Sequence, residues 1–230
     1  MRACGILMPV FSLPGPFGIG TLGKEAFAFV DFLAGAKQTY WQILPIGPTG
    51  YGDSPYQSFS AFAGNPYYID LQLLTEQGLL QPGEAAAPDW GLRPDWVDYA
   101  KLYANRFLVL KKAWSRSRWE QDTDFSDFCR KNRTWLEDYA LFMALKDSFG
   151  GREWQAWPEE IRLRRPAALA DWQKRLRQET IFWKYVQYLF FSQWERLKDY
   201  ANQKGIRMIG DIPIYVAMDS ADVWIGGSRF

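Results

Sequence analysis

Histidine is absent from this sequence of 230 residues. Without an imidazole, the protein can build neither a histidine-ligated metal site nor a Ser-His-Asp or Cys-His nucleophile system. Acid–base catalysis by histidine is excluded for the same reason. Any catalysis must therefore depend on carboxylates.

Cysteine is scarce as well, and the two that occur, Cys4 and Cys129, lie far apart. Small secreted proteins that depend on disulfides contain more cysteines at closer spacings. The sequence therefore predicts two reduced thiols in a cytoplasmic protein rather than a disulfide framework.

Long apolar runs are missing too, since none approaches the ~20 residues that a membrane-spanning helix needs. The amino terminus begins like a signal peptide, but Pro9 and Pro14 interrupt it and no small-residue cleavage site follows. We interpret it as a buried strand. No membrane partner is expected.

An excess of charge of either sign is also lacking. The 27 basic and 26 acidic residues give a net charge of +1 and are spread along the chain, so nothing attracts a polyanion such as nucleic acid. Hydrophobic residues, by contrast, make up 48% of the sequence, which predicts a folded chain with a substantial core.

Three aspartates, Asp122, Asp124 and Asp127, have a spacing that partly matches a calcium-binding loop. The residues between them break the ligand pattern, and no glycine provides the sharp bend that such a loop needs. We therefore predict no metal site.

The first 70 residues are rich in glycine and proline and contain two short apolar runs, at residues 5–10 and 40–46. Both runs are typical of buried strands. Between them, residues 21–36 carry apolar side chains at helical spacing, with Gly35 as a stop signal. A strand, a helix and a second strand in this order predict a parallel sheet.

Residues 71–203 differ in character, because long, charged and aromatic-rich segments alternate with prolines. We expect a helical insertion here, together with helices that flank the sheet. Apolar residues at steps of three and four mark two helix faces. They are Trp135, Tyr139, Phe142, Leu145 and Phe149 on one helix, and Trp183, Val186, Phe190, Trp194, Leu197 and Ala201 on the other.

Residues 204–230 form a third region, which begins with strand character at residues 206–212. Gly205 is expected to end the long helix before it. Ser220 precedes a sequence that is typical of the start of another helix. The chain is thus predicted to divide at residues 70 and 203.

The loop after the second strand, residues 47–58, combines three glycines and two prolines with polar and aromatic side chains. In (β/α) barrels, the loops that follow strands build the binding site. Ser54 and Gln57 offer hydrogen-bonding groups. They stand beside the rings of Tyr51 and Tyr56, and this combination suits the hydroxyl edges and the C–H face of a sugar. An ordinary turn-rich surface loop is the alternative that composition leaves open.

Asp211 ends the third apolar run and lies just before Pro213. A strand that ends in Gly-Asp places its acid at the carboxyl-terminal rim of a (β/α) barrel, where such barrels hold their ligands. The carboxylate can hydrogen-bond a ligand hydroxyl or cap a neighbouring turn. Its place on the same rim as the loop after residue 46 favours the ligand.

Aromatic residues make up 17% of the sequence, which would suit an extended carbohydrate track. Most of them fall at helical spacing in the insertion, however, where core packing explains them. Tyr51 and Tyr56 are the exceptions, because they stand in a loop of glycines and prolines.

Six stretches of the sequence resemble the amylomaltase family of 4-alpha-glucanotransferases, also called disproportionating enzymes or glycoside hydrolase family 77. They are residues 2–6, 12–20, 41–50, 52–58, 182–194 and 210–224. Among the most specific are Gly-Asp-Ser-Pro-Tyr-Gln-Ser at 52–58 and the run that begins Gly-Asp-Ile-Pro-Ile-Tyr-Val at 210–216. The similarity extends essentially from end to end.

This resemblance implies an α/β fold, the amino-terminal part of a (β/α)8 TIM barrel with about three strands and a large helical insertion. It implies an enzyme without metal or organic cofactor that transfers α-1,4-glucan segments between maltooligosaccharides. Such enzymes are retaining catalysts, in which an aspartate attacks the anomeric carbon and a glutamate serves as acid and then as base.

The resemblance also implies roles for individual residues. Ser54, Tyr56 and Gln57 match the loop that lines the donor side of the cleft, with Tyr56 stacked near the reacting sugar. Asp211 matches the acid that hydrogen-bonds the hydroxyls of that sugar. Tyr51 matches a tyrosine of a secondary glucan-binding groove.

The nucleophile, the acid/base and a third carboxylate of the family lie on later barrel strands, so all are expected beyond Phe230. No catalytic residue is therefore assigned here. After Trp224 the sequence departs from the family pattern, and we expect a truncated product that is inactive alone. An open sheet edge would favour self-association through that edge or poor solubility.

Two other classes of function remain open from the sequence. The chain could be a non-catalytic glucan-binding protein that uses Tyr51, Tyr56 and Asp211. It could also be a helical interaction module built on residues 71–203, with the barrel part as a remnant.

Overall fold

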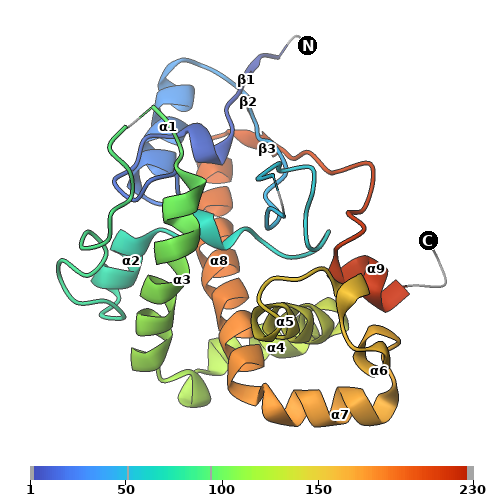
Figure 1. Cartoon of the computed structure of the whole chain (residues 1–230). Helices are drawn as coiled ribbons and strands as arrows, with labels where there is room; N and C mark the ends of the chain where they lie inside the picture. The colour runs from blue at the N-terminus through green and yellow to red at the C-terminus, as the bar shows by residue number, and fades with distance from the viewer. Residues whose placement is uncertain (1–2, 51, 94, 227–230) are drawn as a thin grey trace. The chain divides into compact units, whose positions relative to one another are not determined.

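A computed structural model of the chain describes residues 3–50, 52–93 and 95–226 (Figure 1). Its contacts divide the chain into two compact units. The first unit contains Met1–Ile46, Asn65–Arg118 and Leu189–Ile212, and the second contains Gly47–Gly64, Trp119–Tyr188 and Pro213–Phe230. Each unit draws on all three sequence regions, and the domain division at residues 70 and 203 stays a prediction.

A parallel sheet of three strands forms part of the first unit (Figure 1). The strands are β1 (Gly5–Leu7), β2 (Tyr40–Gln42) and β3 (Arg207–Ile209), in that order across the sheet. Ile6 pairs with Trp41, and Trp41 pairs with Met208. Because α1 (Lys24–Gly35) connects β1 to β2, the predicted order of strand, helix and strand is present.

Trp41 of β2 is fully buried within this unit. Its indole N–H donates a hydrogen bond to the carbonyl oxygen of Met8 at 2.8 Å. Its ring lies 5.0 Å from that of Phe29 on α1, in an edge-to-face contact. Burial of such a large ring removes much apolar surface from water, so this contact stabilises the packing of α1 on the sheet.

All three strands are shorter than the apolar runs that predicted them. A proline follows each strand after a few residues, namely Pro9, Pro45 and Pro213. Proline has no N–H to donate to a neighbouring strand and fixes its own φ. Pro9 therefore prevents β1 from continuing much beyond Leu7, and in each case the loop that follows begins close to the strand end.

Two helices and part of a third complete the first unit. They are α2 (Leu71–Glu76), α3 (Tyr99–Arg116) and residues 189–203 of α8 (Arg177–Gln203). Arg106 of α3 is fully buried, and its guanidinium donates hydrogen bonds of 3.2 Å to the carbonyl oxygens of Ile69 and Phe17. It also lies 5.0 Å from the ring centre of Trp90. Burial lowers the pKa of Arg106 to about 10, because desolvation disfavours the charged form.

Asp70 caps the amino-terminal end of α2, and hydrogen bonds fix both its side chain and its main chain. Its carboxylate accepts hydrogen bonds from the N–H of Leu73 at 2.9 Å and from the hydroxyl of Thr21 at 2.6 Å. The buried side-chain amide of Gln193 accepts from the main-chain N–H of Asp70 at 2.7 Å and donates to its carbonyl oxygen at 3.1 Å. Gln193 thus satisfies both main-chain groups of one residue, as a neighbouring strand would.

The second unit is mainly helical. Its helices are α4 (Thr123–Lys131), α5 (Arg133–Ser148), α6 (Glu159–Arg162), α7 (Pro166–Arg175), residues 177–188 of α8, and α9 (Ala221–Gly226). Most residues of the two predicted helix faces are buried, among them Tyr139, Phe142, Leu145, Trp183 and Val186. α9 begins where it was predicted, because the hydroxyl of Ser220 accepts a hydrogen bond from the N–H of Val223 at 3.3 Å.

Three buried aromatic rings form a cluster in this unit. Phe142 of α5 lies 5.4 Å from Trp157 and 5.9 Å from Trp224 of α9, and the two tryptophans are 5.6 Å apart. The indole N–H of Trp224 donates to the carbonyl oxygen of Ile161 at 3.2 Å. The guanidinium of Arg164 lies 4.3 Å above the centre of the same indole. The cluster therefore ties α9 to α5 and α6.

Gln187, in the part of α8 that belongs to the second unit, is fully buried. Its amide accepts from the N–H of Gly64 at 2.7 Å and donates to the carbonyl oxygen of Gly64 at 3.0 Å.

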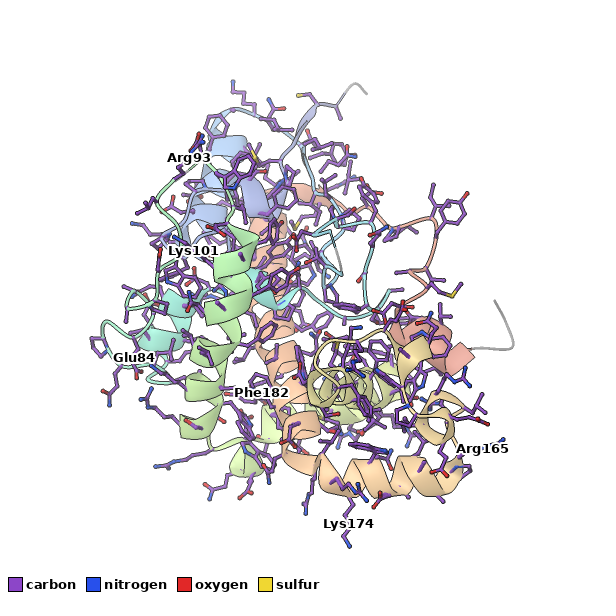
Figure 2. All side chains as sticks on the ribbon, in the orientation of Figure 1. Glu84, Arg93, Lys101, Arg165, Lys174 and Phe182 are labelled. Carbon is purple, nitrogen blue, oxygen red and sulfur yellow. The ribbon has the colours of Figure 1, made fainter. Side chains whose placement is uncertain are left out.

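Charged side chains such as Lys174 of α7 point outward in Figure 2, whereas Phe182 of α8 is buried. Among the described residues, no helix combines the length and apolar character that crossing a membrane requires.

Candidate functional site

The loop after β2 folds back on itself within the second unit. The N–H of Gly50 donates to the carbonyl oxygen of Gln57 at 2.8 Å. Between them, Gly52 and Asp53 both adopt left-handed backbone conformations, with φ of 87° and 58°. Glycine accepts this conformation freely, and aspartate accepts it more readily than most residues. Tyr56 and Gln57 follow this reversal in the sequence.

Tyr56 and Gln57 line a pocket of about 430 Å³. The other lining residues are Gly50 and Phe59 from the same loop, and Tyr215, Val216, Ala217, Met218 and Asp219 from the segment after Pro213. The volume falls in the range of roughly 300–1,000 Å³ that is usual for small-molecule sites. The side chain of Tyr56 is 45% exposed, so a ligand in the pocket can reach its ring.

Ser54 and Asp211, which were also predicted for the site, are not among the described residues that line this pocket. The hydroxyl of Ser54 accepts a hydrogen bond from the N–H of Tyr56 at 3.3 Å, so Ser54 helps to fix the loop. Asp211 belongs to the first unit, and its carboxylate accepts from the N–H of the adjacent Ile212 at 2.8 Å. Tyr51 lies outside the described residues.

The segment of residues 215–219 is the part of the pocket that the sequence analysis missed. It follows the third strand and Asp211, at the position where a (β/α) barrel places ligand-binding loops. Apolar side chains are unusually exposed here, since Ile214 and Tyr215 are 89% and 83% exposed. Exposed apolar residues in a row mark an interaction surface. The apolar run at residues 212–216 was therefore the sequence signal from which this part of the pocket could have been predicted.

Two hydrogen bonds attach the loop after β2 to the first turn of α9. The N–H of Ala221 donates to the carbonyl oxygen of Phe59 at 2.8 Å. The carboxylate of Asp222 accepts from the N–H of Ala61 at 2.7 Å. Burial raises the pKa of Asp222 above its usual value, although the hydrogen bond from Ala61 partly opposes this shift.

Asp222→Asn should stabilise the second unit at neutral pH, because the amide oxygen can still accept from Ala61 while no charge is buried. At pH values between the unfolded-state and the folded-state pKa, Asp222 keeps its proton in the folded protein but has lost it in the unfolded chain. The stabilising contribution of that proton is present at low pH and disappears as the pH rises through the folded-state pKa. The advantage of the variant should therefore be largest near about pH 7 and should shrink toward about pH 4. Thermal unfolding at both pH values measures this difference, and a variant that is less stable than the wild type near neutrality would contradict it.

The chemistry of the pocket suits a hydroxyl-rich ligand. An aromatic ring, an amide side chain and main-chain groups can recognise a sugar through its C–H face and its hydroxyls. Among the described lining residues, Asp219 supplies the one carboxylate, and it is ion-paired with Lys146 at 2.5 Å. Glycosidic bond cleavage normally uses two carboxylates, so the pocket is equipped to bind and orient a sugar.

A metal site is not evident within the described ranges. No group of three or more histidine, cysteine, aspartate or glutamate side chains gathers there closely enough to hold an ion.

Comparison with known sequences shows similarity to one family. A sequence model described as 4-alpha-glucanotransferase matches residues 8–230. A 4-alpha-glucanotransferase from Thermus thermophilus is 50% identical over 227 residues, covering 97% of this chain and 44% of that protein. One from Clostridium butyricum is 48% identical over 217 residues, covering 94% of this chain and 45% of that protein. The chain spans about half the length of the curated relatives that it matches.

Solved structures give the same result. The amylomaltase from Streptococcus agalactiae in complex with acarbose matches with a TM-score of 0.95 and 45% identity, over 100% of this chain and 47% of that one. The amylomaltase from Corynebacterium glutamicum matches with a TM-score of 0.76 over 96% of this chain and 32% of that one; at 19% identity it supports the fold alone. With the parallel sheet, these matches confirm the expected α/β fold, the amino-terminal part of a (β/α)8 barrel with a helical insertion.

Proposed function

This chain belongs to the 4-alpha-glucanotransferase family, glycoside hydrolase family 77, and we propose that its residues build the donor side of an α-1,4-glucan-binding cleft. The enzyme would transfer α-1,4-glucan segments from one maltooligosaccharide to another. The observation that supports this most directly is the pocket in which Tyr56 and Gln57 meet residues 215–219. Two loops that the sequence places after neighbouring strands, β2 and β3, contribute to it.

Within this pocket the roles divide by chemistry. The ring of Tyr56 offers a flat apolar face for the C–H side of a glucose unit, and the amide of Gln57 can hydrogen-bond its hydroxyls. Ser54 fixes the loop by accepting from the N–H of Tyr56. We further propose that Asp211 hydrogen-bonds hydroxyls of the donor sugar, and that Tyr51 contributes to a secondary glucan-binding groove.

The transfer itself requires two more carboxyl groups. In a retaining reaction, an aspartate attacks the anomeric carbon while the glycosidic C–O bond breaks and a glutamic acid protonates the leaving oxygen. The glutamate then takes a proton from the acceptor hydroxyl, which displaces the aspartate and forms the new glycosidic bond. Neither group is assigned to a residue of this chain, so glucan binding is the property by which the chain itself can be tested.

Tyr56→Ala should weaken the binding of maltoheptaose to the 230-residue polypeptide by about tenfold. The reason is that the loss of a stacking face costs about 1–1.5 kcal/mol. Isothermal titration calorimetry measures the affinity. Phe62→Ala is the matched control, because Phe62 is an exposed aromatic residue of the same unit that stacks on Trp135 and does not line the pocket.

The titration separates three results. Saturable wild-type binding that only Tyr56→Ala weakens would support the donor site. Equal affinities for the wild type and both variants would place the glucan elsewhere on the chain. No binding heat from the wild type at millimolar maltoheptaose would remove the proposed function.

Two further proposals concern the state of the protein. The edge strands of the described sheet, β1 and β3, expose Leu7 and Ile209, which supports self-association through a sheet edge. Cys4 and Cys129 are not paired with each other, which supports a reducing, cytoplasmic location.

A further inference from the structure

The side chain of Lys146, on α5, contacts both walls of the glucan pocket. We infer that Lys146 is a positioning residue for that pocket, which holds the loop wall (residues 50–59) and the segment wall (residues 215–219) at a fixed separation. The inference rests on the proposed function of the pocket. It does not make Lys146 a ligand-binding residue, because Lys146 is not among the residues that line the pocket.

The contact with the segment wall is an ion pair. The Nζ of Lys146 lies 2.5 Å from a carboxylate oxygen of Asp219 and 3.2 Å from the carbonyl oxygen of Arg152. Lys146 is only 5% exposed. A lysine is rarely buried unless its charge is paired and hydrogen-bonded, so Asp219 is fixed in place by the requirement to neutralise this ammonium group.

The contact with the loop wall is made through an aromatic ring. The same Nζ lies 4.9 Å from the ring centre of Phe59 and 5.7 Å from that of Phe142. An ammonium group at this distance is attracted to the negative face of the ring, more strongly where water is excluded. Phe59 and Asp219 both line the pocket, so one buried charge bridges its two walls.

Within the described part of the chain, the hydrogen bonds that hold the segment wall lie near its carboxyl-terminal end. The carbonyl oxygen of Met218 accepts hydrogen bonds from the indole N–H of Trp154 at 2.8 Å and from the amide of Gln155 at 3.4 Å. The main-chain N–H of Trp154 donates to the second carboxylate oxygen of Asp219 at 3.3 Å. Removal of the Lys146 ammonium leaves Asp219 with this longer bond, and Tyr215 at the other end of the wall is largely exposed. The wall should then sample several positions, and the pocket would no longer be preorganised.

Lys146→Met tests the inference, with Lys184→Met as the matched control. Lys184 also forms an ion pair within the second unit, with Glu137 at 2.5 Å, and neither residue lines the pocket. Lys146→Met should weaken maltoheptaose binding at least about tenfold, because a misplaced binding group loses its contribution. Lys184→Met should stay within about threefold of the wild type.

A second measurement needs no ligand. The indole N–H resonance of Trp154, assigned by its loss in Trp154→Phe, reports the hydrogen bond to Met218. This resonance should shift in Lys146→Met and should be unchanged in Lys184→Met. If Lys146→Met fails to fold, Asp219→Asn removes the same ion pair from the segment wall and should give the same shift and the same loss of affinity.

The outcomes are distinct. If Lys146→Met and Asp219→Asn lower the melting temperature as Lys184→Met does, but leave both the affinity and the Trp154 resonance unchanged, the inference is overturned. If the resonance shifts without a change in affinity, the wall moves but does not position the glucan, which also overturns it. If the wild type itself binds no maltoheptaose, the proposed function fails first, and the positioning role fails with it.

Discussion

Trp224→Ala should lower the free energy of unfolding of the second unit by about 4 kcal/mol, a typical loss for a buried tryptophan. Trp224 is only 3% exposed, and its removal takes two ring contacts from the aromatic cluster, with Phe142 and Trp157. The carbonyl oxygen of Ile161 also loses its hydrogen bond, and the guanidinium of Arg164 loses the indole face beneath it.

Urea unfolding followed by near-UV circular dichroism measures this loss. Trp96→Ala is the matched control, because it deletes the same side chain at a position that is 66% exposed. Its effect should stay within about 0.5 kcal/mol. A loss below about 1 kcal/mol for Trp224→Ala would mean that the cluster does not hold α9 in place.

Arg106→Ala should lower the free energy of unfolding of the first unit by about 3 kcal/mol, and the net value is a balance of opposing effects. Two carbonyl oxygens, of Ile69 and Phe17, lose hydrogen bonds from a charged donor, which costs about 1.5–3 kcal/mol each. The cavity left by the side chain adds about 2 kcal/mol. Against this, the variant no longer buries a charge whose pKa is lowered to about 10, which returns about 3 kcal/mol.

Chemical denaturation with a second arginine variant as control checks this prediction. Arg93→Ala removes an arginine whose ion pair with Asp95 is largely exposed on both sides, so it should lower the free energy of unfolding far less than Arg106→Ala does. Equal effects of the two variants would contradict the balance given for Arg106. A stabilised Arg106→Ala would mean that the charge penalty outweighs the hydrogen bonds.

The parts of the fold that depend on local sequence were predictable. Apolar spacing and Gly35 located α1, and Ser220 located the start of α9. The barrel was predicted from the family resemblance, because three short strands by themselves do not identify a (β/α)8 barrel. The strand lengths were overestimated because the apolar runs continue past residues where pairing stops, close to Pro9, Pro45 and Pro213.

The candidate site was predictable only in part. Glycines, prolines and aromatic rings identified the loop that carries Tyr56 and Gln57. Residues 215–219 were missed because their approach to that loop depends on packing between segments that lie more than 150 residues apart in sequence.

Arg106 and Lys146 could not be found from the sequence. Each is a charged residue within a helix that also carries apolar residues, and such residues usually lie on the solvated face. Only the structure shows both to be buried. Their partners are mostly main-chain oxygens and aromatic rings, which leave no pattern in the sequence.

The pairing of Gln187 with Gly64 and of Gln193 with Asp70 has a genetic consequence. A single-base change converts either glutamine codon to one for glutamate. The new side chain keeps its size but has no N–H, so a carboxylate oxygen would face a main-chain oxygen in the protein interior, where two acceptors repel. Substitution of either glutamine by glutamate should therefore be tolerated far less than is usual for a polar residue.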